Sequence, residues 1–327
     1  MEDKEYTQYK EDVNAAFNSA MEKNNAERPQ LGHVDVTHNR GHQVDENDPE
    51  YIRMKEFAGF IDLPLENLPS AGRFYRDDFR IKIRAALTKE IRNFSLIDEN
   101  NMQDVDEKLN DILVSCVKVS FGESIGSYKD ILEEDRLYVI LSVRELTFKN
   151  GENKIMMQAS KKCECGGCED SYELKTENIQ CYTPDEEIEK YYDPEIKGYK
   201  ILTKSYGEIV LAPPTIGVMR AITSWARKKE EEHKQWDKSL FQIVPYLIRE
   251  WRGFDERNIM AFATNIAGWD AKKFAIVFRM AEKIKVGVKP EFTYTCDKCG
   301  GSVTVPLSFQ DGLRSLFIIS DIADELL

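Results

Sequence analysis

The sequence lacks any long uncharged apolar run. A helix that spans a bilayer needs roughly 20 consecutive apolar residues, whereas the longest runs here, such as residues 137–143, end in charge after a few positions. The first residues, MEDKEYTQYKEDVN, carry acids where a signal peptide has a basic stretch followed by an apolar one. We therefore expect no membrane span and a soluble protein that is made and kept in a cytoplasm.

Positive charge is also scarce. The 327 residues include 45 Lys and Arg against 58 Asp and Glu, which gives a formal net charge of −13. Nucleic-acid affinity comes largely from basic side chains that displace counterions from phosphates, so an acidic surface disfavours such partners. The net charge of −13 therefore argues against nucleic acid as a partner.

The sequence motifs of common catalytic sites are missing. No GxxxxGK[ST], GxGxxG, GxSxG or HExxH occurs, and the chain has only four histidines for acid–base or nucleophilic roles. Its acidic pairs stand in runs that are typical of solvated surfaces. We expect a protein that is not an enzyme.

Cysteine is the residue type whose distribution stands out. Six of the seven cysteines fall into two groups: Cys163, Cys165, Cys168 and Cys181 around the phrase CECGGC, and Cys296 and Cys299 in CDKCGG. Clustered cysteines in a reducing compartment more often bind metal than form disulfides. Cys116 lies on a helical stripe and is expected to be a small core residue.

One pair of thiolates supplies half of the tetrahedron that zinc prefers. We therefore predict that Cys165, Cys168, Cys296 and Cys299 bind a single structural zinc, with the roughly 130 residues between the pairs inserted into a split zinc ribbon. Cys163 is an alternate, because it can replace Cys165 where the CxC and CxxC spacings overlap. A local site of Cys163, Cys165, Cys168 and Cys181 is a second arrangement, with the C-terminal pair as a redox couple or idle. The absence of any metal is a third.

Periodicity predicts an α+β fold, predominantly helical, with a small split zinc-ribbon-like β module. The expected parts are a flexible N-terminal arm at 1–55 with His33, His38 and His42, an α/β helical domain at 56–152, a β-rich segment with the first cysteine cluster at 153–214, a helical insertion at 215–288, and a second cysteine knuckle with a C-terminal helix at 289–327.

Several elements can be placed within these parts. Ile81 and Ile83 alternate on one face of a short strand, helices are expected near 105–117 and 134–148, and residues 198–212 predict a hairpin. The Trp and Phe residues of the helical insertion, Trp251 among them, are expected to form its core rather than a small-molecule pocket.

Four sequence segments, taken in their order along the chain, resemble those of a known protein family. LPSAGRFY at 68–75, RIKIRAALTKE at 80–90, LEEDRLYVILSVRELTF at 132–148 and EIVLAPPT at 208–215 follow one another around the cysteine-bearing stretch. In this order the chain resembles the baseplate hub and assembly proteins of T-even-type contractile-tailed bacteriophages, over roughly residues 65–215.

The resemblance implies a structural or assembly protein of the phage tail baseplate, at its hub, without enzymatic activity. Its partners would be other baseplate and tail-tube proteins, with a homo-oligomer as a further option. Its location would be the virion tail baseplate, or the host cytoplasm during assembly. The alternative function is an intracellular zinc-ribbon regulator that binds nucleic acid or a polymerase, against which the acidic charge argues. A metal-dependent hydrolase without a recognisable motif is the third.

Overall fold

The computed structural model describes residues 59–148, 154–163, 165–309 and 312–317. The chain divides into two units, Met1–Glu56 and Phe57–Leu327, and every element described below belongs to the second. The expected N-terminal arm, with its three histidines, lies outside the described residues. So does most of the expected C-terminal helix, of which a short 3₁₀ helix at Leu313–Leu316 is described.

A four-stranded antiparallel sheet opens the described part of the chain. Its strands β1 (Ile61–Leu63), β2 (Phe79–Ile83), β3 (Val117–Phe121) and β4 (Ser124–Ile125) are neighbours in that order. Side chains alternate between the two faces of a strand, so Ile81 and Ile83 are buried, as predicted, while Arg80 between β2's buried positions is exposed. One face of the sheet thus belongs to the core.

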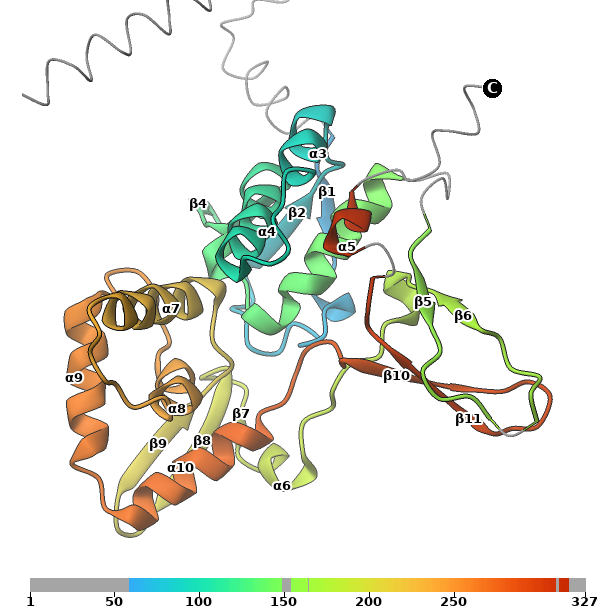
Figure 1. The fold of residues 1–327 in the computed structure, drawn as a ribbon. Coiled ribbons are helices and arrows are strands. Elements are labelled where there is room, and N and C mark those ends of the chain that lie inside the picture. The colour runs from blue at the N-terminus through green and yellow to red at the C-terminus, as the bar shows by residue number, and fades with distance from the viewer. Residues whose placement is uncertain (1–58, 149–153, 164, 310–311, 318–327) are drawn as a thin grey trace, which may run out of the picture. The chain divides into compact units, whose positions relative to one another are not determined.

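Three helices accompany this sheet (Figure 1). Helices α3 (Thr88–Phe94) and α4 (Met102–Cys116) connect β2 to β3, and α5 (Arg136–Thr147) follows β4. The side chain of Asn101 accepts hydrogen bonds from two amides of the first turn of α4, which fixes where that helix begins. Helix α5 contacts both α4 and β2, and Cys116 is fully buried as expected. The two helices predicted in this region are confirmed.

A buried polar network ties the loop before β2 to the start of α5. The Asp135 carboxylate accepts hydrogen bonds from the Ser70 amide at 2.9 Å, the Ser70 hydroxyl at 2.6 Å and the Tyr75 hydroxyl at 2.7 Å. The Tyr75 oxygen in turn accepts the Leu132 amide hydrogen at 3.0 Å. Buried polar atoms are costly unless hydrogen-bonded, so this network fixes one geometry for the loop.

A three-stranded antiparallel sheet and five α-helices form the middle of the described chain. The strands β7 (Tyr192–Asp193), β8 (Gly198–Thr203) and β9 (Gly207–Leu211) follow the short helix α6 (Glu186–Glu189), and β8 with β9 confirms the predicted hairpin. Helices α7 (Ile216–Glu231), α8 (Leu240–Leu247), α9 (Glu256–Ala267) and α10 (Ala271–Lys283) come next. Helix α8 contacts α7, α9, α10 and β9, so it is the centre of this group. No helix in the described ranges is both long and apolar enough to cross a membrane.

Two small hairpins complete the fold. One joins β5 (Met156–Gln158) to β6 (Ser171–Glu173), and the other joins β10 (Glu291–Thr295) to β11 (Ser302–Pro306). They lie side by side in Figure 1 although more than a hundred residues separate them in sequence, and β5 contacts β11. The structure therefore confirms an α+β fold of helices and small antiparallel sheets. The domain boundaries within it stay predictions.

Candidate metal centre

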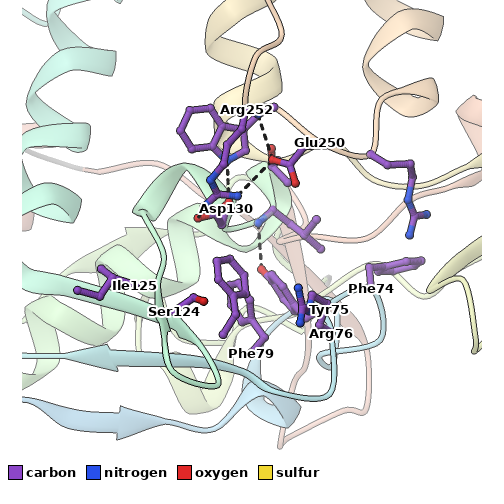
Figure 2. Close-up of a pocket in the computed structure, with 14 residues that line it drawn as sticks. Phe74, Tyr75, Arg76, Phe79, Ser124, Ile125, Asp130, Glu250 and Arg252 are labelled. Atoms are coloured by element: carbon purple, nitrogen blue, oxygen red, sulfur yellow. Dashed lines mark hydrogen bonds and ion pairs between the residues drawn. The ribbon is translucent and has the colours of Figure 1, made fainter.

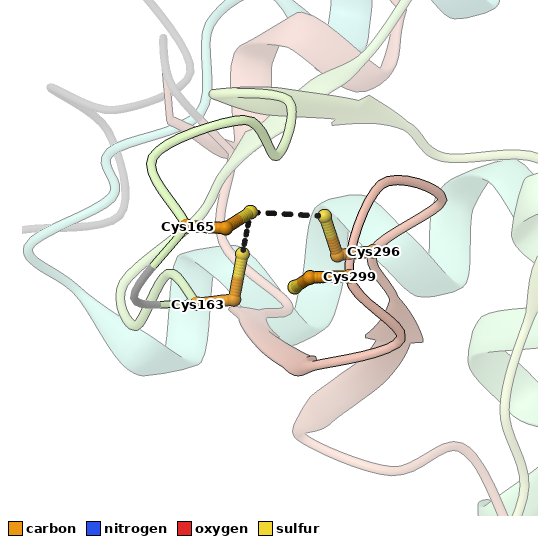
Figure 3. A group of neighbouring side chains, drawn as sticks. All are labelled: Cys163, Cys165, Cys296 and Cys299. Atoms are coloured by element: carbon orange, nitrogen blue, oxygen red, sulfur yellow. Dashed lines mark hydrogen bonds between the residues drawn. The ribbon is translucent and has the colours of Figure 1, made fainter.

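Four cysteines from the two hairpins gather at one place. Cys163 and Cys165 lie in the loop between β5 and β6, and Cys296 and Cys299 lie in the turn between β10 and β11. Their four sulfur atoms are all within 4.8 Å of one another. Figure 3 shows the side chains pointing toward one another from the two loops.

The sulfur spacing matches that of a tetrahedral ion for Cys165 and Cys296, and is shorter than it for Cys163 and Cys165. Zinc–sulfur bonds of about 2.3 Å place neighbouring sulfurs of a tetrahedron about 3.8 Å apart. The Cys163 and Cys165 sulfurs are 3.1 Å apart, and those of Cys165 and Cys296 are 3.7 Å apart. Four clustered cysteines with this spacing can hold a metal ion.

Direct contacts between the hairpins explain how residues 131 positions apart meet. The Ser160 amide donates to the Thr304 carbonyl at 3.0 Å, and the Thr304 amide donates to the Lys161 carbonyl at 2.9 Å. The rings of Tyr172 and Tyr294 stack with centroids 4.3 Å apart. The cysteine-bearing loops are thereby held against each other by backbone pairing and ring contact as well as by the sulfurs.

Glycines let the C-terminal turn fold tightly around its sulfurs. The Gly300 amide donates to the Cys296 carbonyl, and Gly300 has a φ of 70°, a conformation that side chains disfavour. A Cβ atom on Gly301 would lie 2.9 Å from the Cys163 Cβ and 3.1 Å from the Cys299 sulfur. The Gly301 amide also donates to the Cys299 sulfur at 3.3 Å. The backbone conformation thus favours glycine at position 300, and the packing favours it at position 301.

The thiols differ in how readily they ionise. The backbone amides of Lys298 and Cys299 lower the pKa of Cys296 to about 7, because they donate hydrogen bonds to its sulfur. The hydrogen bond with Cys165 raises the pKa of Cys163 to about 11. Four crowded thiols do not all ionise easily on their own, and a divalent cation is the charge that would favour four thiolates together.

Cys168 borders this group, but neither Cys168 nor Cys181 is one of its four members. Cys168 is half-buried and hydrogen-bonds to Cys163, but it is not one of the four whose sulfurs converge. Cys181 forms an isolated backbone bridge with Val288, and burial raises the pKa of its thiol. Of the predicted ligands, the structure thus brings together Cys165, Cys296 and Cys299, and Cys163 stands where Cys168 was expected.

The sequence contains one indication that Cys163 is a ligand. The phrase CECGGC contains both a CxC and a CxxC spacing, and only the folded loop distinguishes them. The sulfurs of this CxC pair lie 3.1 Å apart, and Gly166, which follows Cys165, has a φ of 63°. The Gly167 amide then donates to the Cys165 sulfur at 3.3 Å.

Comparison with known proteins gives one match. The model of the family described as T4 bacteriophage base plate protein matches residues 61–314, a stretch that contains both cysteine-bearing hairpins and most of the described residues. No curated protein and no solved structure matches the chain.

Proposed function

The chain belongs to the family of T4 bacteriophage base plate proteins, and from this premise we propose that it is a structural or assembly protein at the hub of a contractile-tail baseplate. The family supports a structural role in a phage baseplate. The finer proposal is that the protein works by contact with other baseplate and tail-tube proteins, either in the virion or in the host cytoplasm during assembly. This role requires no catalysis, and the family match does not support the nucleic-acid regulator.

We further propose that Cys163, Cys165, Cys296 and Cys299 bind a structural zinc. The observation that carries this is the convergence of four sulfurs, all within 4.8 Å, from two separate hairpins. A zinc ion would supply the positive charge that lets all four thiols ionise. An all-cysteine site of this kind leaves no open position for a substrate, which fits a structural role.

A zinc cross-link between cysteines so far apart in sequence would stabilise the folded chain strongly. Cys165 and Cys296 are 131 residues apart, and closing a loop of that length in the unfolded chain removes conformational entropy equal to about 5 kcal/mol. The gain is comparable to the whole stability of many domains. In the proposed role, the cross-link fixes the β10–β11 hairpin against the β5–β6 hairpin, so that neighbouring proteins meet a rigid module.

Metal analysis on single Cys→Ser variants tests the ligand set. We expect one zinc per chain in the wild type, its loss in Cys296→Ser and in Cys163→Ser, and its retention in Cys181→Ser, the matched control outside the group. Retention in Cys168→Ser is expected as well. Loss of zinc in Cys168→Ser together with full retention in Cys163→Ser would overturn the proposed set in favour of the one that contains Cys168.

Cosedimentation tests the baseplate role separately. We expect the protein in purified phage particles or in their assembly intermediates, detected by mass spectrometry of gradient fractions. Its absence from both would refute the role. Size-exclusion chromatography with light scattering on the zinc-loaded protein addresses the further proposal that the chain self-associates.

A further inference from the structure

A cavity of about 350 Å³ lies where the first sheet meets the segment that follows α8. The loop before β2, the strand β4 and residues 249–252 line it, so segments far apart in sequence contribute. Figure 2 shows Glu250 and Arg252 on one side, across from Phe79 and Ser124 on the other. None of these residues takes part in the cysteine cluster.

Three arginines line the cavity in a chain whose net charge is −13. They are Arg76, Arg249 and Arg252. Arg76 forms an ion pair with Asp78, and Arg252 forms ion pairs with Asp130 and Glu250, whereas Arg249 has no carboxylate partner among the described residues. One guanidinium of the lining is therefore available to a further anion.

Asp130 belongs to the framework of the cavity and is not available to a ligand. Its side chain is only 6% exposed. It accepts hydrogen bonds from the Trp251 indole at 2.7 Å, the Arg252 guanidinium at 2.6 Å and the Ser127 amide at 2.7 Å. These bonds occupy three of the roughly four acceptor positions of the carboxylate and hold Trp251 and Arg252 in place. Trp251, expected to be a core residue, is thus a wall of the cavity.

An aromatic ring joins two of the arginines. The guanidinium carbons of Arg76 and Arg252 lie 5.6 Å and 5.5 Å from the centre of the Phe121 ring, within the range of a cation–π contact. The nearby Ile125 side chain is 93% exposed. The cavity thus combines oriented guanidinium groups with apolar surface.

Arg249 is the arginine that is free to meet a new anion. Its guanidinium donates to the backbone carbonyls of Ile196 and Lys197, and among the described residues no carboxylate lies within ion-pair distance of it. An arginine has five N–H donors, so these carbonyls leave several unused. Gly198 leaves the space that the Arg249 guanidinium occupies, because a Cβ atom at position 198 would collide with it. The arginine is thereby held in position while it remains exposed.

We infer that this cavity binds an acidic segment of a partner protein, with one carboxylate on Arg249 and an apolar side chain against Phe121 and the exposed Ile125. The guanidinium of Arg249, which has no carboxylate partner among the described residues, favours an anionic occupant, and the apolar surface of Phe121 and Ile125 favours a peptide over a bare anion. The volume suits one or two side chains. The inference rests on the proposed role as a protein that acts through protein contacts, and it names the surface and the chemistry of one such contact.

Peptide binding in solution tests the inference. The probe is a fluorescein-labelled octapeptide amide in which four glutamates flank one phenylalanine, and the comparator has glutamine in place of each glutamate. Fluorescence anisotropy is read on the full-length zinc-loaded protein at physiological ionic strength. We expect the acidic peptide to bind the wild type, and Arg249→Gln to weaken binding by about tenfold or more, as expected for a lost hydrogen bond between charged groups.

The matched control is Arg257→Gln on α9, which removes the same charge from a side chain that is 91% exposed and lies outside the cavity. It is expected to change affinity less than twofold, whereas Gly198→Ala, which displaces Arg249, is expected to weaken binding as Arg249→Gln does. Circular dichroism verifies that each variant is folded, and Gly198→Ala serves as the test variant if Arg249→Gln is not folded.

Three results would overturn the inference: no binding of the acidic peptide, equal binding of its glutamine analogue, or equal loss in Arg249→Gln and Arg257→Gln. Displacement by millimolar inorganic phosphate as effective as that by unlabelled peptide would show a simple anion site and overturn the peptide assignment. Because no phage particle enters this assay, its failure leaves the baseplate role standing, and absence from particles would leave the peptide result standing.

Discussion

Replacing Glu134 by glutamine is expected to make the stability of this protein less sensitive to pH. Glu134 lies in the 3₁₀ turn η3 (Glu133–Asp135), and Gly287 packs against it so closely that a Cβ there would be 3.0 Å from the Glu134 Cβ. Its Oε2 atom is shielded from solvent and has no hydrogen-bond partner in the described part of the chain. Burial, with smaller contributions from the Asp135 and Glu133 carboxylates, raises the pKa of Glu134 to about 8.

The protonation of Glu134 decides whether the free energy of unfolding rises or falls with pH. The pKa of Glu134 is raised from 4.5 to about 8 in the folded state, so the folded chain holds a proton that the unfolded chain releases. This contribution to stability is fully present below about pH 4.5 and is lost as the pH rises through about 8. Each pH unit between these limits costs about 1.4 kcal/mol, so about 2–3 kcal/mol is lost between about pH 5 and pH 7.

Urea unfolding of the zinc-loaded protein at several pH values measures this loss. The wild type and Glu134→Gln share every other titrating group, so the difference between their free energies of unfolding isolates Glu134. We expect Glu134→Gln to gain about 2–3 kcal/mol relative to the wild type over that range. Glu66→Gln, which changes an exposed carboxylate, serves as the control and should show a constant difference. A constant difference for Glu134→Gln as well would refute the reasoning.

Three further outcomes are expected. Gly301→Ala should weaken zinc binding by about 10- to 100-fold, because the added Cβ atom would crowd Cys163. Competition with a chromophoric chelator measures the zinc affinity, and an unchanged affinity would contradict this expectation. Tyr75→Phe should lower the free energy of unfolding by about 2–4 kcal/mol, since the Asp135 carboxylate and the Leu132 amide each lose a hydrogen-bond partner. Urea unfolding measures this, and a loss below about 1 kcal/mol would argue against the network. Zinc removal by a chelator should expose the two cysteine-bearing hairpins to protease while the helical circular dichroism signal stays nearly constant, and simultaneous loss of both would show a wider role for the metal.

Local patterns in the sequence were sufficient for the regular elements. The alternation around Ile81 and Ile83 predicts β2 because a strand with one buried face imposes a period of two. The helical spacing of apolar residues predicts α4 and α5 in the same way. The cysteine spacing was equally local, and it identified both loops of the candidate site.

Contacts between distant residues could not be predicted in this way. The choice between Cys163 and Cys168 depends on how the β5–β6 loop turns against the other hairpin, and the sequence CECGGC permits both. Trp251 has the spacing of a residue on α8, but that helix ends at Leu247, where Ile248 takes an extended conformation. Trp251 therefore lies beyond the helix, on the wall of a cavity whose other residues come from remote parts of the chain.

The order of the four sulfurs along the chain bears on biosynthesis. A ribosome releases Cys163 and Cys165 well before Cys296 and Cys299, so a nascent or truncated chain presents only two of the four sulfurs. Two thiolates bind zinc far more weakly than four. Occupancy of the proposed centre would accordingly distinguish finished polypeptides from incomplete ones, and only finished polypeptides would carry the rigid module into an assembling tail.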